Sequence, residues 1–210
     1  MSVLRIPDHD DRADLGTFVG RAVRLDPAAV VRLRRTPGGR VTAWVTTPFD
    51  VLATRSVPGA LDPDDVTAPA TGLLTALSVD RAEAVDPGAG GLWQGLLPSD
   101  EGWSVVDTVP AAELESLTDR GLALARENAG PLGPPASLLD QTVLTVSGGT
   151  VPQVKVPLRC LFALSGMGFL GASDGDEVVR VSAMSAWLRL DARYGAVVRR
   201  RLAALPLLTP

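Results

Sequence analysis

The side chains that most often carry out chemistry are scarce in this chain. Its 210 residues include one histidine, one cysteine and one tyrosine, and Lys155 is the only lysine beside 19 arginines. A zinc site with several cysteine or histidine ligands cannot be built from one such subunit. A nucleophile activated by histidine would depend on His9, and Lys155 does not follow the glycines of a phosphate-binding loop. The chemistry that remains is that of carboxylates, hydroxyls and arginines.

The polar run Asp8-His9-Asp10-Asp11 brings carboxylates and an imidazole together, as a divalent-cation site would require. The same residues also suit the start of a helix, where aspartates accept hydrogen bonds from free N–H groups and complement the helix dipole. We interpret the run as a helix cap in a polar N-terminal segment, predict no metal ligand there and expect His9 to be dispensable. Cys160 precedes an apolar pair and is predicted to be a buried, unreactive thiol.

The segment Gly166-Met167-Gly168-Phe169-Leu170-Gly171 has the glycine spacing of a dinucleotide-binding loop, and Asp191 follows twenty residues later. That motif works only where a strand precedes the glycines and a helix follows them. Here a helix is predicted to precede the glycines, and a loop-like polar segment follows. We therefore interpret the glycines as a helix end and a turn, and we predict no cofactor.

Arginines are concentrated in two segments. Residues 21–55 hold seven arginines against two aspartates, residues 178–210 hold six against one, and residues 56–127 hold three against thirteen acidic residues. The candidate anion-binding residues are Arg32, Arg34, Arg35, Arg40, Arg199, Arg200 and Arg201.

These arginines have two interpretations. In the first, they form one exposed surface for nucleic acid or another polyanion, with binding that weakens steeply as salt is added. Alternatively, they pair with acidic residues of the middle segment, within a chain or between chains, and salt then loosens the pairs or the oligomer. The acidic partners considered are Asp62, Asp64, Asp65, Glu113 and Glu115. A net charge of −4 favours pairing, because a nucleic-acid-binding module is typically basic.

Two stretches 88 positions apart share one pattern. In Val66–Leu74 and Val154–Phe162, extended-looking residues run into a proline, and an apolar pair follows. Proline suits the first turn of a helix, where its missing N–H would have no partner. Each stretch is predicted to be the end of a short strand that turns directly into a helix. Leu74 and Phe162 are equivalent in this repeat, so we expect both to be buried against a sheet.

The other elements are predicted to be mostly antiparallel strands. A strand at 2–6 and a helix ending at Asp26-Pro27 precede a meander at 30–35, 40–47 and 51–57, followed later by hairpins at 92–97 with 103–109 and at 142–146 with 151–156. In the meander, apolar residues at 41, 43 and 45 alternate with Thr42, Trp44 and Thr46, so one face should pack on helices. A helix should run from Pro110 to about Asn128. Residues 183–202 fit one helix or a hairpin that turns at Tyr194-Gly195, and the mid-way glycine favours the hairpin.

These elements predict an α+β protein of two related halves, with mainly antiparallel sheet and helices packed on one face. We place the halves at residues 1–110 and 111–210, with the segment 130–135, rich in proline and glycine, as the alternative boundary. A hydrophobic content of 46% is typical of a soluble globular protein. The absence of a leader-like or membrane-spanning run and the single cysteine predict a cytoplasmic location.

The stretch Ala43-Trp44-Val45-Thr46-Thr47-Pro48-Phe49-Asp50-Val51-Leu52-Ala53-Thr54-Arg55 resembles part of an uncharacterised actinobacterial protein family of unknown function. That resemblance extends over most of the chain and implies no activity. A second resemblance is architectural: the predicted order of strand, helix and three strands, repeated within residues 1–109, is similar to the duplicated unit of DNA sliding clamps. Val66–Leu74 resembles the strand–helix junction in such clamps.

Three functions remain as hypotheses. The leading one is a non-enzymatic cytoplasmic protein that acts through contacts with other proteins or with itself as a homo-oligomer. The second is binding of nucleic acid or another polyanion through the arginine segments. The third is an enzyme that uses carboxylate or arginine chemistry. None of the three involves a membrane.

Overall fold

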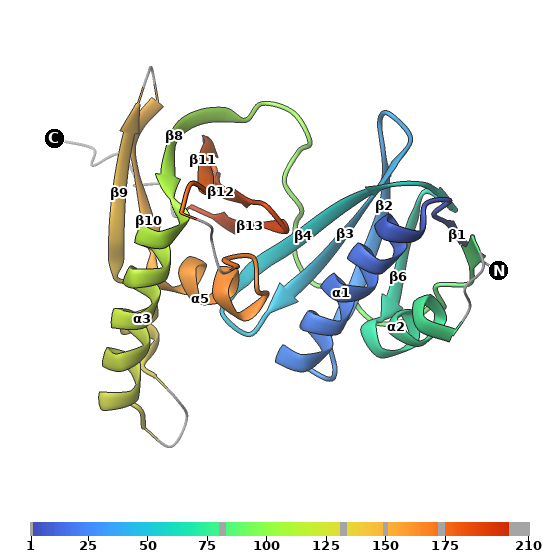
Figure 1. Ribbon diagram of the computed structural model, residues 1–210, viewed down its shortest axis with the longest axis horizontal. Coiled ribbons are helices and arrows are strands. Elements are labelled where there is room, and N and C mark those ends of the chain that lie inside the picture. The colour runs from blue at the N-terminus through green and yellow to red at the C-terminus, as the bar shows by residue number, and fades with distance from the viewer. Residues whose placement is uncertain (1, 80–82, 131–133, 149–150, 172–174, 202–210) are drawn as a thin grey trace, which may run out of the picture.

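The computed structural model describes residues 2–79, 83–130, 134–148, 151–171 and 175–201. Figure 1 shows an elongated molecule, with the N-terminal elements at one end and most elements after residue 104 at the other. Among the described residues, no helix combines the length and the apolar character needed to cross a membrane.

An eight-stranded sheet runs through both halves, and all its neighbouring strands pair antiparallel. In spatial order, its strands are β6 (Asp65–Pro69), β2 (Val30–Thr36), β3 (Arg40–Thr47), β4 (Val51–Pro58), β13 (Gly195–Arg200), β12 (Trp187–Ala192), β11 (Val178–Met184) and β8 (Ser104–Pro110). The N-terminal half supplies the first four strands, which join the last four where Leu52–Thr54 of β4 pair with Ala196–Val198 of β13. In each group of four, the outer strand leads into a helix and the other three form a meander. This arrangement confirms two related halves.

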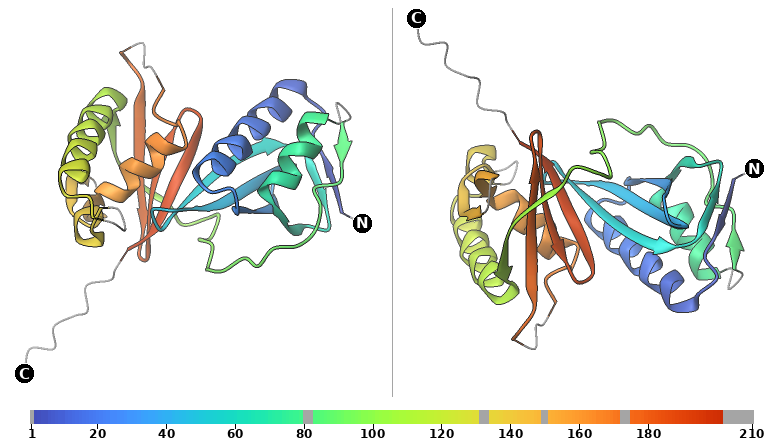
Figure 2. Two further views of the ribbon diagram at one scale, coloured as in Figure 1. Left: turned by 90° about the horizontal axis from the view of Figure 1, so that it is seen from below. Right: turned by 90° about the horizontal axis from the view of Figure 1, so that it is seen from above.

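Two small sheets and five helices complete the fold. The small sheets have the strand orders β5-β1-β7 and β10-β9. Their strands are β1 (Val3–Arg5), β5 (Ala60–Asp62), β7 (Ala84–Val85), β9 (Thr142–Gly148) and β10 (Val151–Pro157). The helices are α1 (His9–Leu25), α2 (Ala70–Val79), α3 (Ala111–Glu127), α4 (Ala136–Leu139) and α5 (Leu158–Gly166). Figure 2 shows the long helices on one face of the large sheet, as predicted, and the connection from β7 to β8 on the other face.

Proline marks the junction between strand and helix at three places. Pro69, Pro110 and Pro157 are each the last residue of a strand, and a helix begins at the next residue. The extended backbone before the helix accommodates proline, and the first helical turn needs no N–H from it. The two predicted corners are therefore confirmed, and the start of α3 at residue 111 follows the same rule.

The core lies between the large sheet and the helices. On β3, Val41, Ala43 and Val45 join this core, whereas the alternate residues Thr42 and Trp44 belong to the other face. The predicted repeat holds at one position of the apolar pair: Leu73 and Leu161 are both fully buried. At the next position, the expectation was wrong for α2, because Leu74 is only half-buried while Phe162 is 5% exposed.

Two other predictions about strands had different outcomes. The hairpin in residues 183–202 is confirmed as β12 and β13, which turn at Arg193-Tyr194. The hairpin of 92–97 with 103–109 is wrong: residues 92–97 form no strand, and β8 pairs with β11 instead. The flanking Pro98 and glycines give a local turn signal, but the partner of β8 lies about 70 residues away in sequence, where local patterns carry no information. Residues 131–133 of the predicted linker and Gly149 of the 142–156 hairpin turn lie outside the described residues.

Candidate functional site

The N-terminal arginines lie against acidic residues of their own chain. Arg32 on β2 donates through Nε to Asp65 Oδ1 at 2.8 Å and through Nη2 to Asp65 Oδ2 at 2.7 Å. Arg34 approaches Asp65 at 3.8 Å, and Arg35 pairs with Asp64 at 3.1 Å. The hydrogen bonds from Arg32 hold the pKa of Asp65 below its ordinary value, against the opposing effect of burial. Two of the predicted acidic partners therefore neutralise most of this segment.

The C-terminal arginines have a different environment. Arg199 donates to Asp140 at 3.0 Å, and the same carboxylate accepts from the buried Arg159 at 2.9 Å. Burial raises the pKa of Asp140, but the hydrogen bonds and charges of the two arginines outweigh it and lower the pKa overall. Arg201 donates to a backbone carbonyl at 3.3 Å, whereas Arg200 is exposed and has no ion pair among the described residues.

The strand register separates the two arginine groups. Arg40 pairs with Pro58 at one end of β4. Val198, which directly precedes the C-terminal arginines on β13, pairs with Leu52 near the other end of β4. Six residues of extended chain separate the two levels, which corresponds to about 20 Å. Arg199 also shares the helix-side face with its cross-strand partner Leu188, so the groups do not form one surface.

The other chemistry-bearing residues occupy structural positions. Asp8 caps α1, since its Oδ1 accepts from Asp10 N at 2.8 Å and Asp11 N at 3.0 Å, and these bonds lower its pKa. His9 is exposed in the first turn of α1. Cys160 is fully buried, and burial raises its pKa to about 12, which leaves no reactive thiolate. The part of the chain that the structure describes holds no group of three or more metal-ligating side chains.

The glycine motif is the end of α5 and a turn. α5 ends at Gly166, and Gly168 has a φ of +59°. The N–H groups of Gly168 and Phe169 donate to Ser165 O and Leu164 O, each at 2.8 Å, which is a common way to close a helix. Because a helix precedes these glycines, they lack the strand that a dinucleotide site requires.

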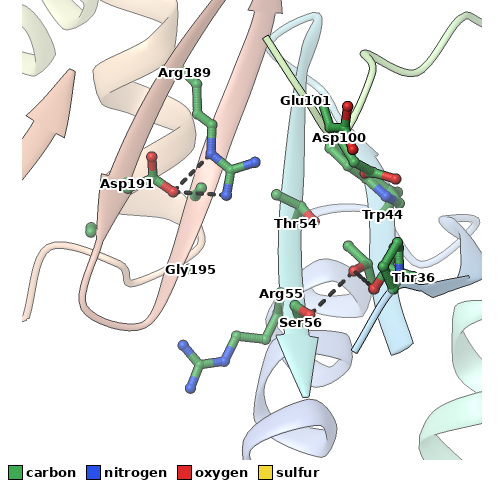
Figure 3. Close-up of a pocket in the computed structure, with 14 residues that line it drawn as sticks. Thr36, Trp44, Thr54, Arg55, Ser56, Asp100, Glu101, Arg189, Asp191 and Gly195 are labelled. Atoms are coloured by element: carbon green, nitrogen blue, oxygen red, sulfur yellow. Dashed lines mark hydrogen bonds and ion pairs between the residues drawn. The ribbon is translucent and has the colours of Figure 1, made fainter. Parts of the chain in front are cut away.

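A cleft at the junction of the two halves brings polar side chains together (Figure 3). It has a volume of about 510 Å³ and lies on the sheet face opposite the helices, where Asp100 and Glu101 of the connection from β7 to β8 contribute to its lining. Residues of β3 and β4 from the N-terminal half and of β12 and β13 from the C-terminal half line it. We call it the junction cleft.

Hydroxyl groups form one side of the junction cleft. Thr36 Oγ1 and Thr42 Oγ1 are 3.3 Å apart, and Thr42 Oγ1 is 3.2 Å from Ser56 Oγ. Arg40 holds this row of hydroxyl groups in place by donating through Nε to Ser56 Oγ at 3.0 Å. The three hydroxyls are therefore ordered by one another and by a cation behind them.

Thr54 lies between this row of hydroxyl groups and the wall of the cleft that carries Arg189 and Asp191 (Figure 3). The residue is 3% exposed, and its Oγ1 has no hydrogen-bond partner within the described residues. A buried hydroxyl without a partner costs about 1–3 kcal/mol relative to a paired one. The orphaned hydroxyl distinguishes the junction cleft from an ordinary polar surface.

Charged side chains form the other walls. Arg189 binds Asp191 Oδ1 through both Nε at 2.8 Å and Nη2 at 2.7 Å. The guanidinium carbon of Arg189 also lies over the ring of Trp103, 5.8 Å from its centroid. Asp191 Oδ2 and Arg189 Nη1 keep no partner among the described residues. The side chains of Asp100 and Glu101 are exposed and likewise lack partners there.

The junction cleft is suited to hydrogen bonding more than to covalent chemistry. The described residues that line it include no histidine, cysteine or lysine that would activate one of the hydroxyls. Part of it was accessible from sequence, because Thr42 and Trp44 alternate with apolar residues and had to share a face. The contribution of Arg189 and Asp191 was missed, since it depends on the pairing of β4 with β13.

Comparison with protein families gives two matches. Residues 98–204 match the family described as Domain of unknown function (DUF8185), and residues 1–93 match Domain of unknown function (DUF8010). Comparison with curated proteins finds no match.

Solved structures similar to this chain include DNA polymerase sliding clamps. The clamp from Caulobacter crescentus has a TM-score of 0.59 and 17% identity, covering 99% of this chain and 67% of the clamp. The clamp from Bacillus subtilis has a TM-score of 0.59 and 12% identity, covering 98% and 65%. The clamp from Pseudomonas aeruginosa has a TM-score of 0.55 and 15% identity, covering 98% and 66%. The chain thus spans about two thirds of the length of these clamps, and the likeness shows the fold.

Proposed function

Because the chain belongs to the family described as Domain of unknown function (DUF8185), which assigns no activity, we propose a function from geometry: a non-enzymatic cytoplasmic protein that acts by protein–protein contact and self-associates. The observation that carries the proposal is the open edge of β9. The sliding-clamp likeness supplies the fold, and a fold by itself carries no activity.

β9 is an edge strand with little protection of its own, although its last residue, Gly148, lies against the backbone of Val106 on β8. It consists of Thr-Val-Leu-Thr-Val-Ser-Gly, without charge or proline, and within the described residues it pairs with β10 alone. Edge strands that must stay unpaired normally carry charges or proline, or are covered. The edge strand β6 has such protection: it contains Asp65 and Pro69, and Gly90 N donates to Thr67 O at 3.0 Å. The contrast supports β9 as a pairing surface.

Pairing of β9 with β9 of a second copy would extend two hairpins into one four-stranded antiparallel sheet. Such a contact is isologous, because the same strand serves on both sides of a twofold axis. Thr145 is the middle residue of β9 and is exposed, so the two copies of Thr145 would lie near the axis.

The test is a like-charge substitution at the axis. In Thr145→Glu two glutamates would oppose each other across the new strand pair, so we expect the dimer to be lost, while Lys155, the partner of residue 145 on β10, attracts the new carboxylate and keeps the hairpin itself stable. Gln153→Glu adds the same charge to the exposed face of β10 in the same hairpin and should leave the dimer intact. Light scattering after size-exclusion chromatography measures the mass of each. A monomeric wild-type protein, or equal behaviour of the two variants, would contradict the proposal.

A further inference from the structure

We propose that the junction cleft binds a neutral polyhydroxy compound, a sugar or a polyol, with Thr54 as the central hydrogen-bonding residue. This ligand site is independent of self-association, because the cleft and β9 share no residue.

The first argument is the mixture of unused donors and acceptors. Asp191 Oδ2 and the carboxylates of Asp100 and Glu101 can only accept, while Arg189 Nη1 can only donate. Thr54 Oγ1 can do both and has no partner within the described residues; the atom is buried, so a ligand bonds to it once the side chain turns about χ1 toward the cleft. A ligand hydroxyl also donates and accepts, so a polyol can satisfy all of these groups. An alkylammonium ligand offers donors alone and would leave the arginine unsatisfied.

The second argument is the charge of the lining. Three carboxylates, those of Asp100, Glu101 and Asp191, outnumber two guanidinium groups, that of Arg189 in the lining and that of Arg40 behind the hydroxyl wall. Arg55 adds no charge to the cleft, because its guanidinium binds Asp14 of α1. The net negative potential would repel a phosphate or carboxylate ligand, whereas a neutral ligand has no net charge for it to repel.

The third argument is the state of the unliganded cleft. Thr36, Thr42 and Ser56 are already ordered by one another and by Arg40. A preordered wall lowers the entropic cost of binding. The volume of about 510 Å³ is within the range of small-molecule sites.

The test separates binding from stability through one substitution. Thr54→Val keeps the size of the side chain but removes the orphaned hydroxyl. We expect the variant to melt at a higher temperature than wild type, because an unpaired buried polar group is lost, and to bind the ligand about tenfold more weakly, the factor that one ordinary hydrogen bond is worth. Titration calorimetry with D-glucose, maltose and myo-inositol, in buffers free of glycerol, measures the affinity.

The matched control is Thr47→Val. Thr47 is 4% exposed, but it faces the helices, and its Oγ1 donates to Val51 O at 2.7 Å. This variant should melt lower and keep wild-type affinity. As a second variant that does not disturb the buried sheet, Asp100→Ala with Glu101→Ala should also weaken binding. Binding of none of the three probes by wild type would overturn the proposal, as would a preference for putrescine or inorganic phosphate. Equal affinities of wild type and Thr54→Val would also overturn it.

Discussion

At the scale of single residues, Asp140 connects three parts of the chain. Its carboxylate follows α4 and accepts from Arg159 of α5 and Arg199 of β13. Arg159 also donates to Phe49 O at 2.8 Å, so the β3–β4 turn joins the same cluster. Both arginines are well shielded from solvent: the side chain of Arg159 is 8% exposed and that of Arg199 is 16% exposed. The side chain of Asp140 is 49% exposed. Arg199 thus pairs with an aspartate of its own chain, and anion binding by this residue stays a prediction.

Removal of this carboxylate should destabilise the protein. In Asp140→Ala the shielded guanidinium of Arg199 loses its carboxylate acceptor, and that of Arg159 keeps only Phe49 O and the more distant Asp50, which should cost about 1–3 kcal/mol of the free energy of unfolding. Asp119→Ala removes an exposed aspartate of α3 that has no ion pair among the described residues, and it should change stability by less than about 0.5 kcal/mol. Urea denaturation at neutral pH measures both.

The pH dependence of this loss has a definite sign. The two arginines lower the folded-state pKa of Asp140, so the unfolded chain binds the proton more readily. The carboxylate therefore stabilises the fold at pH values above its unfolded pKa of about 3.9, and the stabilisation disappears as the pH falls through the lower folded value. The difference between wild type and Asp140→Ala should shrink in the same range. A difference that stays constant down to acidic pH would assign the loss to packing instead.

At the scale of elements, the two corner helices share a buried position but differ in what covers them. Leu73 of α2 and Leu161 of α5 are both fully buried against the sheet. α3 and α4 pack over α5, and Phe162 lies edge-on to Phe49 with ring centroids 5.9 Å apart. Among the described residues, α1 is the helix that packs extensively on α2, and Leu74 remains half-buried. The repeat preserves the corner, while the surroundings diverge.

Alanine substitutions should reveal this asymmetry. Leu73→Ala and Phe162→Ala should each cost about 2–5 kcal/mol, as is usual for large-to-small changes in a packed core. Leu74→Ala should cost less, because part of its surface is already exposed. Thermal unfolding of the three variants measures the order. A larger loss for Leu74→Ala than for Leu73→Ala would mean that the burial of the α2 face is misassigned.

The elements that were predictable from sequence are those whose signals are local. The corners at Pro69 and Pro157 and the turn between β12 and β13 depend on residues that are neighbours along the chain. The partner of β8 and the seam between β4 and β13 depend on contacts between distant segments, which no local pattern specifies. For the same reason, the shared face of Thr42 and Trp44 was foreseeable from the alternation of β3, and the wall with Arg189 was not.

At the scale of the whole molecule, charge is balanced on the layer of helices. α1 carries three aspartates and three arginines, α2 carries no charge, and α3 carries four acidic residues and two arginines. A surface that follows a nucleic-acid backbone needs excess basic residues to neutralise phosphates. Neither the helix layer nor the paired arginines of β2 supply that excess, although the fold is similar to that of sliding clamps.

We therefore expect no binding of nucleic acid. An electrophoretic shift assay with single- and double-stranded DNA and RNA at low salt should show no retardation. Retardation at micromolar protein that disappears with moderate salt would contradict this expectation, and loss of that retardation in Arg200→Glu would assign it to the exposed arginine of β13.

Light scattering over a salt series tests the same balance from another side. Exposed pairs such as Arg35 with Asp64 weaken as salt screens them, but the β9 edge is uncharged and pairs through backbone hydrogen bonds. The mass of the dimer should therefore stay constant between low and moderate salt. A dimer that dissociates as salt rises would show that charge pairs between chains hold it together, and it would move the interface from β9 to the arginine segments.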